Sequence, residues 1–321
     1  MPRQLLIFIS FCLAWATAEP VKLILDTDMS GDADDVGTLA MLHALADLGE
    51  CEILATVTNR RDKTNASAAA TDAINTYYGR PGLPIGTGKA IPTDLRRTSQ
   101  YTRALRDGFP NDIGPDDQAP DALDVLRRVL RAQPDGSVTI CSVGALSNLA
   151  ELCEKEPALI RQKVARLVVM GGEIPHAQRA ETNIGTHIAA ARSVADNWPG
   201  PIYWQGFRVG HRVWTGVRLT ETPQNNPVRR AYELRYFGKR VAIKGGQPSY
   251  DQCAALYAVR GSNPDLWGED ERGKLRFDEK GWAHFSPETE ARDRLVRLAC
   301  PPEKLAKIIE SLMIKPPATR P

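Results

Sequence analysis

Five aspartates lie within ten residues near the start of the chain, in the segment LILDTDMSGDADDVG. They are Asp26, Asp28, Asp32, Asp34 and Asp35, and no histidine or cysteine lies among them. Carboxylates so close together repel one another, and they can be buried only if they take up protons or bind a cation. Oxygen ligands suit a hard ion such as calcium or magnesium better than zinc. The segment therefore predicts a divalent metal site.

Three other interpretations of the segment remain open. An EF-hand calcium loop also begins Asp-x-Asp-x-Ser-Gly, but Gly37 stands where its bidentate glutamate is needed, and the preceding residues suggest a strand rather than a helix. A phosphatase of the haloacid dehalogenase class also follows its first strand with Asp-x-Asp, but it requires a lysine and another aspartate pair at later strand ends. An acidic loop that caps the next helix explains only one or two of the carboxylates.

Apolar runs with strand and helix periodicities alternate along the chain and determine where these aspartates lie. Strands are expected at residues 21–26, 51–58, 137–143, 165–172 and 201–206. Helices are expected at 35–48, 66–78, 121–132, 148–155, 251–260 and 301–315. This alternation predicts one α/β domain with an open, mostly parallel, Rossmann-like sheet and helices on both faces. Such sheets bind ligands beyond the carboxyl ends of their strands, where the aspartates follow residues 21–26.

Several other short motifs are expected to have structural roles. GTGK at 86–89 lacks the spacing of a phosphate-binding loop and is expected to be a turn within a polar stretch from 86 to 120. Gly171 and Gly172 are expected to turn the backbone at a strand end. Asn148 is expected to cap or open a helix.

Composition limits the class of protein. The chain has 321 residues, of which 42% are hydrophobic, and a formal net charge of +2 without a long basic run, so nucleic acid is not an expected partner. Residues 1–18 have the pattern of a signal peptide, ending in Ala16-Thr17-Ala18, which predicts an exported domain at 19–321, periplasmic or secreted and without a membrane anchor.

The cysteines do not form a zinc or redox motif. The mature chain holds an odd number, and none of them forms a Cys-x-x-Cys pair. Two of them, Cys51 and Cys141, lie in expected strands and should be buried. A single disulfide remains open.

The order of four motifs resembles the inosine-uridine-preferring nucleoside hydrolases. These are the strand followed by Asp-x-Asp and then Asp-Asp; VGALSNLAEL at 143–152; VVMGG followed by Glu181-Thr182-Asn183; and Tyr250-Asp251 at the start of a helix. The resemblance covers about residues 21–315. It implies the nucleoside hydrolase fold and hydrolysis of the N-glycosidic bond of a small nucleoside, which gives free base and ribose.

The resemblance also implies roles for individual residues. A calcium ion would be held by Asp28, Asp35, the main-chain carbonyl of Val143 and Asp251, and Asp28 would act as general base toward the attacking water.

The remaining positions that match the motifs would contact the sugar. Asp34 and Asp251 would accept hydrogen bonds from ribose hydroxyls. Glu181 would hold the 5′-hydroxyl, and Asn183 would lie near the ring.

The chain departs from the family at the position of the leaving-group acid. Tyr250 stands where purine-cleaving members have a histidine, and a phenol is a weaker acid at neutral pH than an imidazolium. Either Tyr250 acts with another group or the substrate has an easier leaving group; His176, His211 and Trp214 are candidates for assistance.

Two further positions differ from the family pattern. Five residues, MSGDA, separate Asp28 from Asp34, more than in better-known members, so Asp32 is an additional carboxylate without an assigned role. The family's early asparagine corresponds to either Asn59 or Asn65.

A second class of function stays open. The same fold could bind a ribosylated or sugar ligand without turnover, although Asp28 as a base favours an enzyme. Members of the family are commonly oligomeric, so a homodimer or homotetramer is expected.

Overall fold

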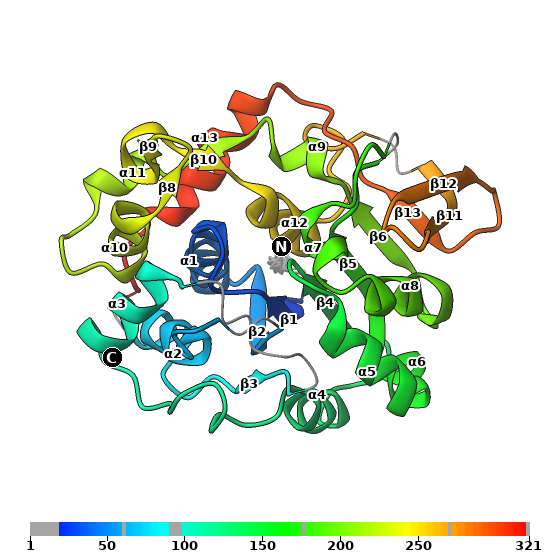
Figure 1. Ribbon diagram of the computed structural model, residues 1–321, viewed down its shortest axis with the longest axis horizontal. Helices are drawn as coiled ribbons and strands as arrows, with labels where there is room; N and C mark the ends of the chain where they lie inside the picture. The colour runs from blue at the N-terminus through cyan, green and yellow to red at the C-terminus, as the bar shows by residue number, and fades with distance from the viewer. Residues whose placement is uncertain (1–18, 60–61, 90–97, 175–176, 269–270, 319–321) are drawn as a thin grey trace, which may run out of the picture.

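The computed structural model describes residues 19–59, 62–89, 98–174, 177–268 and 271–318 (Figure 1). Its central sheet is formed by β1 (Val21–Thr27), β2 (Cys51–Thr58), β3 (Ile85–Thr87), β4 (Val138–Ser142), β5 (Val164–Met170), β6 (Ile202–Gln205), β11 (Glu271–Phe277), β12 (Ala283–Pro287) and β13 (Asp293–Leu295). Two small ribbons pair β7 (Trp214–Thr215) with β10 (Gln247–Pro248), and β8 (Tyr236–Phe237) with β9 (Arg240–Val241).

The central sheet is mostly parallel, as the sequence predicts. Its strand order is β12-β11-β13-β6-β5-β4-β1-β2-β3. Every pair from β13 to β3 is parallel, whereas β11 runs antiparallel to both of its neighbours. The carboxyl ends of β1 to β6 therefore meet at one edge.

Helices cover both faces of this sheet (Figure 1). They are α1 (Asp34–Asp47), α2 (Ser67–Tyr77), α3 (Gln100–Gly108), α4 (Ala122–Arg131), α5 (Ser147–Lys155), α6 (Pro157–Lys163), α7 (Thr182–Thr186), α8 (Ile188–Asn197), α9 (Phe207–Gly210), η1 (Val217–Glu221), α10 (Pro227–Leu234), α11 (Ala242–Gly245), α12 (Tyr250–Arg260) and α13 (Pro302–Met313). None of these described helices has the length and apolar character needed to cross a membrane.

The two faces of β1 pack into separate cores, because successive strand residues point in opposite directions. Leu23 and Leu25 pack with residues of α1, α12 and α13, while Ile24 packs with residues of α4, α5 and α8. The predicted apolar face of α1 is buried, but so is the rest of this helix up to Leu45, because α2, α12 and α13 pack around it.

The sequence interpretation is wrong in the stretch 86–120. Ile85–Thr87 forms strand β3, and residues 100–108 form helix α3. Helix α4 packs closely against β3 at Gly86, where a Cβ would lie 2.9 Å from Ala122 Cα.

The described cysteines are all free, and only Cys300 is not buried. Cys51 and Cys141 lie in β2 and β4, as expected.

Candidate active site

The site lies where the strand order reverses. β1 has β2 on one side and β4 on the other, and the chain continues outward in both directions to β3 and β6. A crevice forms at such a point because the connections leave the two strand ends on opposite faces. Asp28 follows β1 here and Val143 follows β4, and the Val143 N–H donates to the Asp26 carbonyl at 2.8 Å.

Asp26 fixes the ends of three strands rather than lining the cleft. Its Oδ1 accepts hydrogen bonds from the amides of Asn59 (3.0 Å) and Asn148 (2.9 Å), and its Oδ2 accepts one from the Ser142 hydroxyl (2.8 Å). Complete burial raises the pKa of Asp26 to about 6, although these hydrogen bonds oppose the shift. Asn148 thus has a structural role, as predicted, but it does not cap α5, which begins at Ser147 without a side-chain cap; its amide holds the strand ends instead.

The same network decides between the two early asparagines. Asn59 is buried beside the strand ends, whereas Asn65 has φ 53° and donates to Asp117 on the surface. Asn59 is therefore the one associated with the site.

A cleft of about 560 Å³ opens above these strand ends. The loops after β1, β4 and β5 line it together with α7, α9, the end of α10, β8 and the start of α12. Its lining residues are Asp28, Ser30, Gly31, Asp32, Asp34, Thr98, Val143, Met170, Glu181, Thr182, Asn183, Phe207, Arg235, Phe237, Tyr250 and Asp251. Its size is that of a small-molecule site.

The acidic side of the cleft is suited to a cation. Carboxylate oxygens of Asp32, Asp34 and Asp35 lie within 4.8 Å of one another. Burial and then the charge of Asp32 raise the pKa of Asp34 well above its usual range, and burial and then Asp34 do the same to Asp251. Asp34 Oδ1 is buried without a hydrogen-bond partner among the described residues. A hard divalent cation would satisfy these oxygens and balance their charge.

The four predicted calcium ligands come together in this region. Asp28, Val143 and Asp251 line the cleft, and Asp35 is buried beside Asp34, where it accepts a hydrogen bond from the Thr27 hydroxyl. The extra carboxylate, Asp32, belongs to the same cluster, a position that spacing alone did not reveal.

Glu181 and Asn183 lie on the opposite wall. The Glu181 carboxylate caps α7, accepting hydrogen bonds from the N–H groups of Gly172, Asn183 and Ile184. Burial raises its pKa nonetheless. The Asn183 amide donates to the Val143 carbonyl at 3.0 Å. Both side chains are thus held in place while lining the cleft.

Gly172 and Gly144 provide backbone freedom that the site requires. Gly172 turns the chain after β5 with φ 84°, as predicted. A Cβ on Gly144 would lie 2.6 Å from Asn59 Oδ1 and 2.7 Å from Asp28 Cβ. Only glycine lets the loop after β4 approach Asp28 this closely.

Tyr250 and His211 form a pair at the rim of the cleft. The Tyr250 hydroxyl and His211 Nδ1 share a hydrogen bond of 3.0 Å, and both rings stack on Phe207. Burial, followed by the charges of Asp32 and Asp34, raises the pKa of Tyr250, so its hydroxyl stays protonated. The Trp214 indole donates to the His211 carbonyl at 3.1 Å. His176 lies outside the described residues.

Among the lining residues that sequence reasoning missed are Phe207, Arg235 and Phe237. They follow β6 and α10 in segments without a recognisable motif. Their place in the cleft depends on how α9 and β8 pack against the rest of the chain.

Comparisons with known proteins agree with this fold. The family model of the inosine-uridine preferring nucleoside hydrolases matches residues 23–296. An uncharacterized protein of Schizosaccharomyces pombe is 27% identical over 266 residues, which are 77% of this chain and 82% of that protein.

Two solved structures share the fold at low identity. A plant nucleoside hydrolase aligns with a TM-score of 0.72 at 21% identity, covering 92% of this chain and 100% of its own. The type III effector protein XopQ in complex with adenosine diphosphate ribose aligns with a TM-score of 0.69 at 18% identity, covering 94% and 96%. With the family model matching most of its length, the chain belongs to the inosine-uridine preferring nucleoside hydrolase family.

Proposed function

We propose that the protein hydrolyses ribonucleosides to free base and ribose with calcium as its cofactor. The observation that carries the proposal is a single cleft with a buried carboxylate cluster on one side and the Tyr250–His211 pair on another. The reaction needs a base and an acid on different sides of the sugar, because water attacks one face of the sugar while the nucleobase departs from the other.

Calcium would be held by the carboxylates of Asp28, Asp35 and Asp251 and the main-chain carbonyl of Val143. When bound, it supplies positive charge that acidifies a water molecule and orients ribose hydroxyls. Asp28 accepts the proton of the attacking water. Asp34 and Asp251 accept hydrogen bonds from the sugar hydroxyls, which fixes the sugar ring relative to Asp28.

The opposite wall holds the rest of the ribose. Glu181 lies toward the 5′-hydroxyl and Asn183 toward the ring. The bond between C1′ and the base nitrogen breaks as a bond from C1′ to the water oxygen forms. The departing base takes the bonding electron pair and receives a proton from the Tyr250 hydroxyl. His211, when protonated, stabilises the phenolate that remains.

Binding without turnover is the second candidate. Its support is the fold shared with XopQ, which was solved in complex with adenosine diphosphate ribose. A binding protein would need the cleft but not a base at Asp28.

The deciding experiment measures free ribose released from a panel of purine, pyrimidine and pyridine ribosides by residues 19–321. Calcium-dependent release that a chelator abolishes and that Asp28→Asn lowers by about a thousandfold would support the enzyme. Asp265→Asn, the same change at an exposed position outside the cleft, should keep the rate. Tight binding without release by the folded protein would support the binding function instead.

We also propose that residues 1–18, which lie outside the described residues, direct export to the periplasm or medium, and that the mature chain forms a homodimer or homotetramer. The sequence pattern and the family resemblance support these two points. N-terminal sequencing of exported protein and light scattering after gel filtration test them. An uncleaved intracellular product, or a monomer, would contradict them.

A further inference from the structure

The cleft adjoins a second compartment that the proposed reaction does not use. Ser30, Gly31, Thr98 and Arg235 line both spaces. Beyond them lies a pocket of about 200 Å³, which is also lined by Ser99, Gln100, Tyr101, Leu234 and Tyr236. It is located where α3 packs against α10 (Figure 1). A ligand in the main cleft therefore has room to extend a substituent in this direction.

Arg235 lies between the two spaces and is held firmly by its backbone. Its N–H donates to the Ala231 carbonyl at 3.0 Å, and its carbonyl accepts from the Ala242 N–H at 2.7 Å. Among the described residues that line the main cleft, it is the one with a positively charged side chain.

The guanidinium of Arg235 has no partner that explains its position. Its Nε is buried without a hydrogen bond, and no described carboxylate forms an ion pair with it. A buried donor without a partner costs free energy, and at the wall of a cleft a bound molecule can supply the missing acceptor. A guanidinium presents its donors in a planar fork that matches a carboxylate.

The part of the ligand that faces Arg235 follows from the proposed function. The ribose hydroxyls are assigned to Asp34 and Asp251, and the 5′ side to Glu181, so the remaining substituent of the ribose is the base at C1′.

Contacts along the rim agree with this assignment. Phe237, two residues after Arg235, lines the cleft and packs edge-on against Trp214 with ring centroids 5.3 Å apart. The Trp214 indole donates a hydrogen bond to the carbonyl of His211, the partner of Tyr250. The base side of the cleft thus runs continuously from Tyr250 to Arg235.

We propose that Arg235 selects ribosides whose base carries a carboxylate, which extends from the main cleft into the second compartment. This rests on the proposed function, because it takes the ribose to lie at the carboxylate cluster. Ser30, Thr98 and Ser99 add hydroxyl groups to the wall of the passage and pocket. The competing explanation is that Arg235 only offsets the negative charge of the aspartates, in which case it would affect all ligands alike.

Nicotinic acid riboside and nicotinamide riboside form a matched pair of probes. Their bases differ in one group, a carboxylate or a carboxamide. In both ribosides the positively charged ring nitrogen takes the bonding electron pair and leaves neutral without needing a proton, so the comparison separates the Arg235 contact from proton donation. The measurement is kcat/KM for base release from each probe, with calcium present, for the wild type and for Arg235→Gln.

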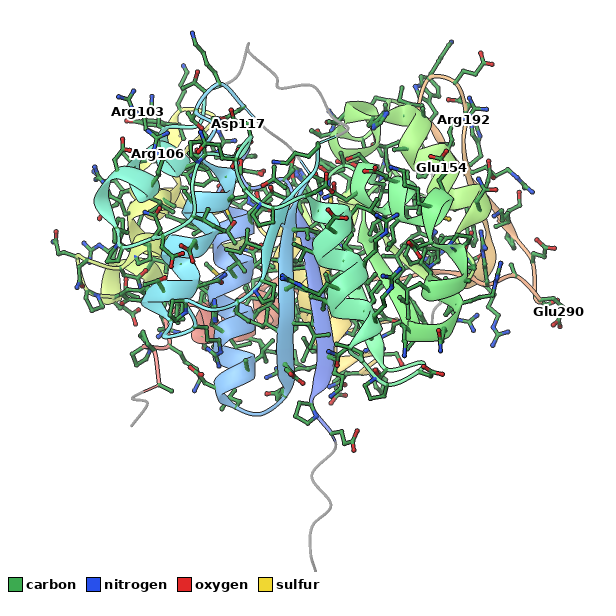
Figure 2. All side chains as sticks on the ribbon, turned by 90° about the horizontal axis from the view of Figure 1, so that it is seen from below. Arg103, Arg106, Asp117, Glu154, Arg192 and Glu290 are labelled. Atoms are coloured by element: carbon green, nitrogen blue, oxygen red, sulfur yellow. The ribbon has the colours of Figure 1, made fainter. Side chains whose placement is uncertain are left out.

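The wild type should prefer the carboxylate by about tenfold or more, the effect of one charge-assisted bidentate contact, and Arg235→Gln should remove most of that preference. Arg235→Lys keeps the positive charge but not the planar pair of donors, so it should retain part of the preference for the carboxylate. It replaces the glutamine variant in the test if that variant does not fold. Arg103→Gln is the matched control, because Arg103 is 69% exposed on α3 and points outward (Figure 2).

An unchanged preference in both Arg235 variants would overturn the inference, as would a wild type that favours the amide. Equal losses on the two probes would show that Arg235 only balances the aspartates. If neither probe is hydrolysed, the proposed function fails for these substrates, and calorimetric dissociation constants for the same two intact ribosides then decide the inference by the same ratio.

Discussion

Tyr250 stands where purine-cleaving members of the family have a histidine. If it donates the proton to the departing base, as proposed, it needs a neighbour that the histidine would not need. Partial burial and the nearby carboxylates raise the pKa of the Tyr250 phenol, which makes it a weaker proton donor. The hydrogen bond to His211 would stabilise the phenolate left after proton donation. Both rings stack on Phe207, which fixes their relative orientation. Tyr250 thus depends on its neighbour in a way that a histidine at the same position would not.

Tyr250→Phe should lower base release from ordinary nucleosides by about a hundredfold or more, because it removes the proton donor while keeping the ring. His211→Gln should have a smaller effect in the same direction. A 4-nitrophenyl riboside, whose leaving group needs no proton at neutral pH, should be hydrolysed by both variants at close to the wild-type rate. The comparison is of kcat on the two substrates.

Tyr203→Phe removes a phenol outside the cleft and should leave both rates unchanged. If Tyr250→Phe slows both substrates equally, the tyrosine positions the ligand rather than donating a proton.

How much of the site could be predicted differs between residues. Asp28, Asp34 and Asp251 could be predicted to lie at the cleft, because Asp28 directly follows the strand β1 and the other two lie at the starts of the helices α1 and α12. Arg235 could not, since its environment is created by α3, which contacts α10 from more than a hundred residues earlier in the chain. The residues around Arg235 in the sequence do not indicate that α3 packs against α10.

At the level of elements, the loop after β4 determines where Asp28 can lie. Gly144→Ala would place a methyl group 2.7 Å from Asp28 Cβ and 2.8 Å from its nitrogen. We expect the substitution to destabilise the protein by about 1–3 kcal/mol and to weaken calcium binding, because the strand end must move. Urea unfolding and calcium titration measure the two effects.

Gly108→Ala is the control, because a Cβ at the end of α3 would meet nothing within 4 Å. Wild-type calcium affinity in Gly144→Ala would show that Asp28 does not hold the ion.

The antiparallel edge of the sheet contains a buried carboxylate whose charge is unfavourable. Asp293 in β13 accepts a hydrogen bond from the Leu275 N–H at 3.0 Å. Burial raises its pKa, although this hydrogen bond and the charges of Lys274 and Arg292 oppose the shift. The folded state therefore holds the proton more tightly than the unfolded state, and the contribution of Asp293 to stability is lost as pH rises through its raised pKa.

Asp293→Asn keeps the acceptor for Leu275 without the charge. Its melting temperature relative to wild type should rise as pH increases from about 4, the ordinary aspartate pKa, and level off once Asp293 is ionised in the folded protein. Thermal unfolding at a series of pH values measures this difference. A difference that is constant with pH would mean that Asp293 does not titrate in this range.

The elements that sequence predicts well are those with an unbroken period. β1, β2, β4 and β5 are buried on both faces and appear as continuous apolar runs, so their alternation with helices indicated the parallel sheet. β3 and β11 to β13 were not anticipated, because β3 is three residues of Ile-Gly-Thr and β11 alternates with charged residues. Their strand character comes from pairing: β3 pairs with β2, β13 with the distant β6, and β11 and β12 with each other as a hairpin.

At the scale of the whole molecule, the site joins parts of the chain that are far apart. Asp28 follows β1, Val143 follows β4, and Asp251 opens α12. Each lies at the end of an element that packs in the main cores. A cation held by all three would link them, so its binding should stabilise the entire fold and not only one loop.

Calcium at a hundredfold excess over its dissociation constant should stabilise the folded state by about 2.7 kcal/mol, through mass action alone. For a chain of this size that corresponds to a melting temperature higher by roughly 4 °C. Calorimetry with calcium and with a chelator measures the difference.

The variant that tests the link is Asp251→Asn, which keeps the shape of the side chain but removes its charge. It should lose most of the calcium-dependent increase, whereas Asp265→Asn should keep it. The metal-free Asp251→Asn protein should also be more stable than the metal-free wild type, because one buried charge no longer repels Asp34 and Asp35. A calcium-dependent increase that persists in Asp251→Asn would mean that the ion binds elsewhere and does not join α12 to the ends of β1 and β4.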